Sequence, residues 1–215
     1  MDIADVKDKT ALNQWLAERN LGGHWDPVRD REEFKPFLWK WGDIYEGLTK
    51  ACDVVPMDET GRRTIQLRNP SLGGRMTNTI HMSVQCVMPG EVAKAHRHTA
   101  AAIRFVVQGV EGAHTVVEGE PVPMGDGDLI TTPSWTWHDH YNNGDKPVIW
   151  LDGLDVRLVG MGRMLQEGFA QDQQTRDKPV GFSVKTLGHV KPSWLKSDMR
   201  TPPFRYPWGD TWETL

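Results

Sequence analysis

Two histidines separated by one residue, His96 and His98, are the first feature of the sequence that could do chemistry. On a β-strand, side chains at positions i and i+2 point to the same face, so these imidazoles could share one metal ion. Such a pair alone also fits surface or hydrogen-bonded histidines. A third histidine, His138, follows within the run GDLITTPSWTWHDHYN.

The residues around these histidines support this interpretation. Turn residues flank both segments: Gly90 and Gly109 around the first, and Gly127, Pro133 and Asn142 around the second. Glycine, proline and asparagine at such places are typical of tight turns between short strands. Both segments resemble the two conserved motifs of the cupin superfamily, and this resemblance implies that His96, His98 and His138 converge on one metal from two chain segments. His140 shares strand parity with His138, and we expect it beside the metal, as a neighbour in preference to a ligand.

The residues that follow the first pair carry no carboxylate, because Ala101, Ala102 and Ile103 occupy these positions. Three neutral imidazoles would leave open positions on the ion, which suits a bidentate anionic substrate together with dioxygen. Imidazole does not select the metal, since zinc, copper, nickel and iron all accept it. Structural zinc is disfavoured, because its sites are closed, usually by four ligands that include cysteine.

Strand parity predicts what else faces this cavity. If His98 faces inward, so do Ala100, Ala102 and Arg104. The alanines leave space over the metal. The Arg104 guanidinium could bind a substrate carboxylate through two hydrogen bonds, or it could form a structural salt bridge.

A polar strand face and one aspartate complete the candidate residues. Within Thr79–Val87, the side chains of His81, Ser83 and Gln85 lie opposite an apolar face. We expect Gln85 near the metal, whereas His81 and Ser83 fit a surface position equally well. Asp152 could orient a ligand histidine through its free ring nitrogen, or it could be an ordinary turn aspartate. One or two of the tryptophans that flank His138 could wall an aromatic pocket; they are Trp135, Trp137 and Trp150.

The elements that must position these residues are short strands. The predicted runs are Arg63–Leu67, Thr79–Val87, Ala101–Val107, Ala113–Glu118, Asp128–Thr132 and Val148–Leu151. Short strands separated by glycine and proline turns indicate an antiparallel sandwich or barrel. We expect helices over residues 1 to 20 and from Trp41 to about Ala51. After Asp155 we expect no clear strands, and a short helix from Met161 to Ala170.

Length and charge limit the classes of protein that remain. A chain of 215 residues fits one large domain, and its net charge of −4 gives no electrostatic reason to expect nucleic acid or an anionic membrane as a partner. The amino-terminal segment lacks the apolar stretch of a secretory signal, and no run is long enough to span a membrane. We therefore expect a cytoplasmic protein, with Cys52 and Cys86 as small buried apolar residues in a reducing compartment.

Longer runs resemble a known family. PGEVAKAHRHTAAAIRFVVQG and GDLITTPSWTWHDHYNNG resemble the two conserved motifs of the cupin superfamily, and with VIWLDGLDVRLV they look like the N-terminal cupin domain of gentisate 1,2-dioxygenases. So do TGRRTIQLRNPSLGG and the WKW at Trp39–Trp41. The terminal FRYPWGDTWETL resembles the segment that joins the two cupin domains of those enzymes. The resemblance also fits relatives that act on salicylate or 1-hydroxy-2-naphthoate.

This resemblance implies a mainly β fold, a cupin double-stranded β-helix (jelly-roll) barrel over residues 63–158. An N-terminal helical arm would precede it, at 1–62, and a C-terminal extension would follow, at 159–215. The resemblance also implies the site residues. Fe2+ would be held by His96, His98 and His138, Arg104 would bind the substrate carboxylate, and Gln85, His140 and Asp152 would line the site, with a second pocket arginine at Arg62 or Arg63.

The implied reaction is the opening of gentisate by O2 to maleylpyruvate, in a protein that binds a small aromatic carboxylate and assembles as a homo-oligomer. The alternatives are a dioxygenase on salicylate or 1-hydroxy-2-naphthoate, a non-catalytic metal-binding cupin, and a metal-dependent isomerase. Members of the family usually carry a second barrel after the joining segment. We therefore expect a fragment of such a protein, a product of a split gene or a single-cupin variant.

Overall fold

The computed structural model describes residues 6–18, 34–57, 61–73, 75–160, 164–187 and 203–215. It divides into two units, Met1–Lys35 and Pro36–Leu215. The first unit contains the helix α1 (Lys9–Ala17), which begins where the Asp8 carboxylate accepts a hydrogen bond from the Ala11 amide. In the described parts of the chain, no helix is long and apolar enough to cross a membrane.

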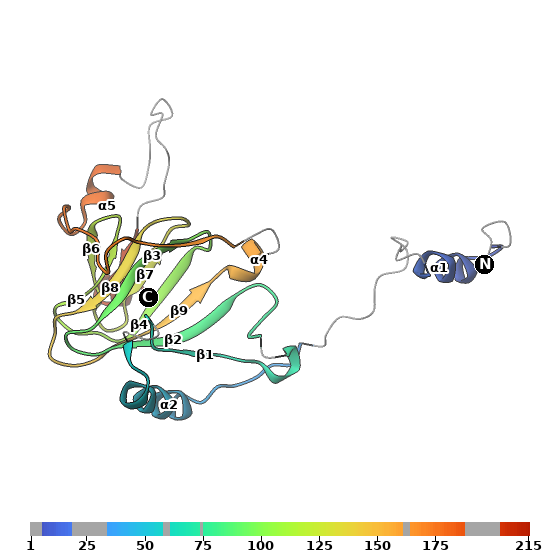
Figure 1. The fold of residues 1–215 in the computed structure, drawn as a ribbon, viewed down its shortest axis with the longest axis horizontal. Helices are drawn as coiled ribbons and strands as arrows, with labels where there is room; N and C mark the ends of the chain where they lie inside the picture. Colours follow the sequence, from blue (N-terminus) through green and yellow to red (C-terminus); the bar gives the residue numbers. More distant parts are fainter. Residues whose placement is uncertain (1–5, 19–33, 58–60, 74, 161–163, 188–202) are drawn as a thin grey trace. The chain divides into compact units, whose positions relative to one another are not determined.

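The second unit contains two antiparallel sheets, which confirms the expected mainly β architecture (Figure 1). The six-stranded sheet has the order β1-β2-β9-β4-β7-β11. Its strands are β1 (Thr64–Gln66), β2 (His81–Val87), β9 (Val148–Leu154), β4 (Ala102–Gln108), β7 (Leu129–Thr132) and β11 (Arg205–Tyr206). The five-stranded sheet has the order β10-β3-β8-β5-β6. Its strands are β10 (Gln166–Gly168), β3 (Val92–His98), β8 (His138–Asn142), β5 (Ala113–Val117) and β6 (Glu120–Pro123).

The hydrophobic core lies between the two sheets. Its main cluster joins side chains of both sheets, among them Val106 and Trp150 of the larger sheet and Ala93 and Val122 of the smaller one. Burial alternates along β4, where Ala102, Arg104 and Val106 are buried and the residues between them are exposed. The alternation is the period of two that a strand with one inward face must show, and it turns Arg104 toward the interior.

The helix α2 (Trp41–Val54) covers part of the outer face of the larger sheet, beside β1 and β2 (Figure 1). Leu48 is buried there against Val84, Cys86 and Ile149. Cys52 packs partly buried against the same cluster, and both cysteines are free thiols. A short 3-10 turn, Pro70–Leu72, connects β1 toward β2.

The segment after Asp155 differs from the expectation. In place of a helix from Met161 to Ala170, the chain forms a short helix α4 (Val156–Gly160) and then β10, while residues 161–163 lie outside the described ones. The helices α5 (Phe182–Leu187) and α6 (Trp208–Thr214) follow, with β11 between them. Both late strands are short and pair with the edges of preformed sheets, β10 with β3 and β11 with β7. Such pairing depends on tertiary context, so local sequence preference does not reveal it.

Candidate metal centre and pocket

His96 and His98 from β3 meet His138 from β8, as the resemblance of their segments to the cupin motifs implies. The two strands pair so that His96 lies opposite His138. One ligand nitrogen from each ring lies within 4.8 Å of the others. All three side chains are buried, with 5%, 6% and 1% of their surface exposed. A single ion could therefore contact all three rings.

Backbone carbonyls fix the orientation of each ring. The Nδ1 atoms lie at hydrogen-bond distance from the carbonyl oxygens of Lys94, Ala100 and Thr136, at 2.9, 2.8 and 2.9 Å for His96, His98 and His138 respectively. A carbonyl can only accept, so it holds the proton on Nδ1 and leaves Nε2 with a free lone pair. The Nε2 atom of His138 is buried without a hydrogen-bond partner among the described residues, as a metal ligand would be.

The three rings are held neutral. Burial lowers the pKa of His96 to about 3, and the nearby positive charge of Arg62 acts in the same direction. Burial also lowers the pKa of His98, and it lowers the pKa of His138 well below its usual value. Metal ligation requires the neutral imidazole, so the site presents the right protonation state before any ion arrives.

The sequence left two interpretations of Asp152 open, a group that orients a ligand histidine and an ordinary turn aspartate. In the structure it lies in β9, and its contacts among the described residues are with Trp150 and Arg104. Its Oδ2 atom accepts a hydrogen bond from Trp150 Nε1 at 2.7 Å, and its Oδ1 atom lies 3.0 Å from Arg104 Nε. The carbonyls that hold the rings are main-chain groups, which a reading of side-chain types does not detect. The carboxylate instead compensates a buried cation.

Arg104 lines the pocket and forms an ion pair with Asp152. Its side chain is 3% exposed, and it pairs with Asp152 and donates a hydrogen bond to the Thr132 hydroxyl. Of the two interpretations of Arg104 left open by its spacing, the structural salt bridge is therefore present. The buried charge does not by itself require a substrate carboxylate.

The structure also distinguishes the two candidates for a second pocket arginine. Arg63 is buried away from the histidines, and its guanidinium forms two hydrogen bonds of 2.8 Å with Glu91. Arg62 lines the pocket and, in the described part of the chain, has no ion pair or hydrogen bond. Burial lowers the pKa of Arg62, Asp152 raises it and Arg104 lowers it. Arg62 is thus a poorly compensated cation that faces the same cavity as the histidines.

The cavity around these groups has a volume of about 380 Å³. Its wall consists of Arg62, Thr64, Gln66, His81, Ser83, Gln85, His96, His98, Arg104, His138, His140, Asp152 and Leu154. His81 and Ser83 thus face inward with Gln85. The Nε2 atom of Gln85 is buried and, among the described residues, has no hydrogen-bond partner. The cavity therefore offers a free amide donor beside the metal ligands.

His140 and the tryptophans have other surroundings. The Nδ1 atom of His140 shares a 2.9 Å hydrogen bond with the Thr115 hydroxyl, and its ring centroid lies 4.8 Å from that of Trp150. His140 lines the cavity but is not part of the cluster of ligand nitrogens. Trp150 is a core residue with no exposed surface, and Trp135 and Trp137 do not line the cavity. The pocket wall is therefore more polar than the tryptophan-rich sequence suggested.

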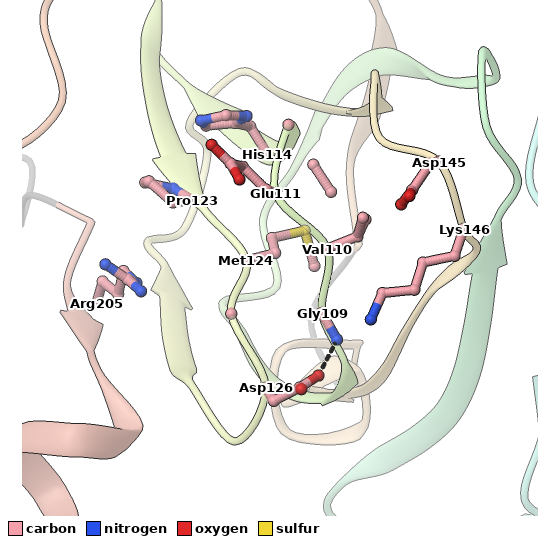
Figure 2. Close-up of a pocket in the computed structure, with 13 residues that line it drawn as sticks. Gly109, Val110, Glu111, His114, Pro123, Met124, Asp126, Asp145, Lys146 and Arg205 are labelled. Carbon is pink, nitrogen blue, oxygen red and sulfur yellow. Dashed lines mark hydrogen bonds between the residues drawn. The ribbon is translucent and has the colours of Figure 1, made fainter.

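A second cavity, of about 870 Å³, lies among the turns that follow β4, β6 and β8 (Figure 2). Val110 and Met124 form apolar parts of its wall, and Lys146 and Arg205 contribute positive charge. The Gly109 amide donates a 2.5 Å hydrogen bond to Asp126, which closes one side. None of the candidate site residues predicted from the sequence lies here. Turn residues make most of its wall, and they carry no pattern that would predict a cavity.

The fold and the site can be compared with known proteins. The cupin domain model matches residues 83–154. The chain is 38% identical over 206 residues to 1-hydroxy-2-naphthoate 1,2-dioxygenase of Nocardioides sp. (strain KP7). The aligned region covers 92% of this chain and 52% of that protein. It is 35% identical over 223 residues to gentisate 1,2-dioxygenase 1 of Aquipseudomonas alcaligenes, over 99% of this chain and 64% of that protein.

A solved structure of the same kind agrees in fold. Salicylate 1,2-dioxygenase from Pseudoaminobacter salicylatoxidans, in an adduct with gentisate, superposes with a TM-score of 0.77 at 33% identity, over 100% of this chain and 62% of that one. The chain thus spans between half and two thirds of the length of these relatives. The likeness covers both sheets and the segment that carries the three histidines. The chain contains a cupin domain, and over nearly its whole length it is similar to gentisate 1,2-dioxygenases and to related 1,2-dioxygenases of salicylate and 1-hydroxy-2-naphthoate.

Proposed function

We propose that the protein is a ring-cleaving dioxygenase that opens gentisate with O2 to maleylpyruvate, with Fe2+ held by His96, His98 and His138. The observation that carries the proposal is that three neutral imidazoles and the unpaired Arg62 guanidinium share one cavity. The relatives named as dioxygenases of gentisate, salicylate and hydroxynaphthoate support the same reaction class.

The residues present fit an iron ion. The ligand cluster found in the described residues has three histidines and neither a carboxylate nor a thiolate, so the ion would keep open positions toward the cavity. Bound there, iron would supply the Lewis-acid and redox chemistry through which dioxygen and an aromatic ring react. The three imidazoles would be held in place by carbonyls of the main chain, which lowers the reorganisation needed on binding.

The chain's own residues can bind and orient the substrate. Arg62 would bind the carboxylate of the substrate, because this pocket cation has no ion pair or hydrogen bond with any other described residue. Arg104 is held by Asp152 and Thr132 and would add a fixed positive potential beside that carboxylate. Gln85 would donate a hydrogen bond from its free amide nitrogen to a substrate oxygen.

His140 would act as a hydrogen-bond partner of the substrate. Burial lowers its pKa well below the usual value, and the positive charge of Arg104 adds to this effect. A ring with so low a pKa does not readily become a cation. We therefore propose that His140 orients a substrate hydroxyl or water without accepting its proton.

The polar wall favours a single-ring substrate. Among the described residues that line the cavity, Leu154 alone is aliphatic, while a polar wall on β1 and β2 consists of Thr64, Gln66, His81 and Ser83. A fused second ring against these groups would remove them from water without hydrogen bonds, which is unfavourable. A ring hydroxyl, as in gentisate, could hydrogen-bond to them.

An oxygen-uptake experiment tests the proposal. Freshly Fe2+-loaded protein would be mixed with gentisate, salicylate or 1-hydroxy-2-naphthoate, with metal-free protein as control. We expect uptake of one O2 per gentisate consumed, and slower turnover of the other two. A preference for the naphthoate would contradict the argument from the polar wall. Iron binding without uptake on any of the three would favour the alternative of a non-catalytic metal-binding cupin.

A homo-oligomer remains a prediction. The outer face of β4 exposes Ile103, Phe105 and Val107, at 48%, 43% and 37% of their surface. Contiguous apolar surface of this kind often marks a protein contact. Light scattering on the purified protein would measure the assembly directly.

A further inference from the structure

Arg97 lies between the ligands His96 and His98 in sequence, but its side chain lies on the other face of β3. Its guanidinium carbon is 4.5 Å from the ring centroid of Trp135 and 4.4 Å from that of Trp137. Its Nε atom donates a 2.8 Å hydrogen bond to Glu167 of β10. We call Arg97, Trp135, Trp137 and Glu167 the outer clamp.

The outer clamp is connected to two metal ligands through the main chain. The Trp135 amide donates a 2.8 Å hydrogen bond to the carbonyl of His98. Thr136, between the two tryptophans, supplies the carbonyl that holds the Nδ1 atom of His138. The guanidinium contacts the rings on both sides of Thr136, on the face of β3 away from the cavity. It therefore restrains the Thr136 carbonyl, which sets the orientation of the His138 ring.

The backbone at Trp135 needs such a restraint. Its φ of +58° is in the left-handed region, which residues other than glycine rarely adopt. A conformation of this kind persists only where its surroundings hold it. A planar guanidinium can stack against two rings at once, which the ammonium group of lysine cannot do.

We propose that Arg97 is a positioning residue of the metal centre: by holding Trp135 and Trp137 and pairing with Glu167, it fixes the ligand of β8 relative to those of β3. It acts through the main chain and touches neither metal nor substrate. The inference rests on the metal site of the proposed function, but not on the identity of the substrate.

Metal binding to the whole chain tests the inference without any turnover. Co2+ serves as the probe, because its absorption spectrum reports ligand geometry and its affinity can be measured by competition with a chelator. The variants are Arg97→Met, which removes charge and stacking, and Arg97→Lys, which keeps the charge. The matched control is Asp172→Asn, which breaks the exposed 3.2 Å ion pair with Lys94 on the same strand.

We expect Arg97→Met to lower Co2+ affinity about 10- to 100-fold, the usual effect of losing a group that orients a ligand, and to change the spectrum. Arg97→Lys should lie between Arg97→Met and the wild type, and Asp172→Asn should match the wild type. Wild-type affinity and spectrum in Arg97→Met would overturn the inference, even if that variant unfolds at a lower temperature. If Arg97→Met does not fold, an unchanged Arg97→Lys spectrum would overturn it. Wild-type protein that binds no Co2+ would instead contradict the proposed metal site.

Discussion

Replacing Arg62 with methionine should separate substrate binding from stability. Arg62 has no ion pair or hydrogen bond in the described structure. Burial disfavours its charge, the charge of Asp152 offsets part of this effect, and the charge of Arg104 adds to it. Methionine has a similar length and no charge. We therefore expect Arg62→Met to unfold at an unchanged or slightly higher urea concentration, while carboxylated substrates bind more weakly.

The magnitude follows from the bond that Arg62 would make. A hydrogen bond to a charged group contributes about 1.5–3 kcal/mol. Its loss corresponds to a rise of roughly 10- to 150-fold in KM, with metal content unchanged. Arg104→Met should behave in the opposite way, because it leaves Asp152 buried without its cation; breaking a buried pair lowers the free energy of unfolding by about 3–5 kcal/mol.

The assay combines oxygen-uptake kinetics on gentisate with urea unfolding and metal analysis of the same preparations. Arg157→Met is the matched control, because Arg157 is an exposed cation close enough to lower the pKa of His81, yet it does not line the cavity. It removes one positive charge from the same region without removing a pocket group. An equal KM in Arg62→Met and Arg157→Met would refute the role of Arg62. A large loss of stability in Arg62→Met would show that its charge has a partner after all.

Three further variants or conditions test the site and the scaffold. His138→Ala should reduce bound metal from about one ion per chain to none after gel filtration, because it removes one of the three converging nitrogens; full metal content would contradict the ligand set. Metal-free protein should lose stability as the pH falls from about 6.5 toward 3, because the pKa of His96 is about 3 in the folded state and the unfolded state binds more protons in this range. The expected loss in the free energy of unfolding is roughly 1.4 kcal/mol per pH unit for each histidine with so low a pKa. Equal urea midpoints at pH 7 and 5.5 would contradict this expectation. Gly127→Ala should lower the free energy of unfolding by at least about 1 kcal/mol, because φ at Gly127 is +78° and the added Cβ would lie 2.7 Å from the ring of Trp208. Thermal unfolding measures the change. A wild-type midpoint would show that the α6 segment can move away from residue 127 without loss of stability.

The metal ligands and the inward face of β4 were predictable because the period of a strand depends only on sequence spacing. His96 and His98 share parity on β3 and therefore face the same side. Arg104 keeps this parity in the sequence, but it lies on β4 in the other sheet, where the alternation of burial along that strand turns it inward. The signal of strand parity is local, and one chain suffices to find it. The approach of the His138 segment was implied by the resemblance to the cupin motifs and not by spacing.

The remaining features depend on contacts that spacing does not encode. Arg62 and Arg63 are neighbours, so they face opposite ways, and only the pairing of β1 with β2 decides which one lines the pocket. The partner of Asp152 lies on another strand, directly opposite in the register of β4 and β9. The strands β10 and β11 have three and two residues, too few for a periodic pattern.

The pairing of Gln166–Gly168 with β3, the strand that carries His96 and His98, determines how far the protein can be truncated at its C-terminal side. A piece cut to the matched family segment, residues 83–154, would keep every metal ligand but leave one side of β3 with bare amides and carbonyls. Exposed strand edges recruit other chains, so such a piece would tend to precipitate with its histidines intact. A soluble minimal version should therefore extend at least through Gln174, whose side chain closes over Asp139 behind the metal ligands.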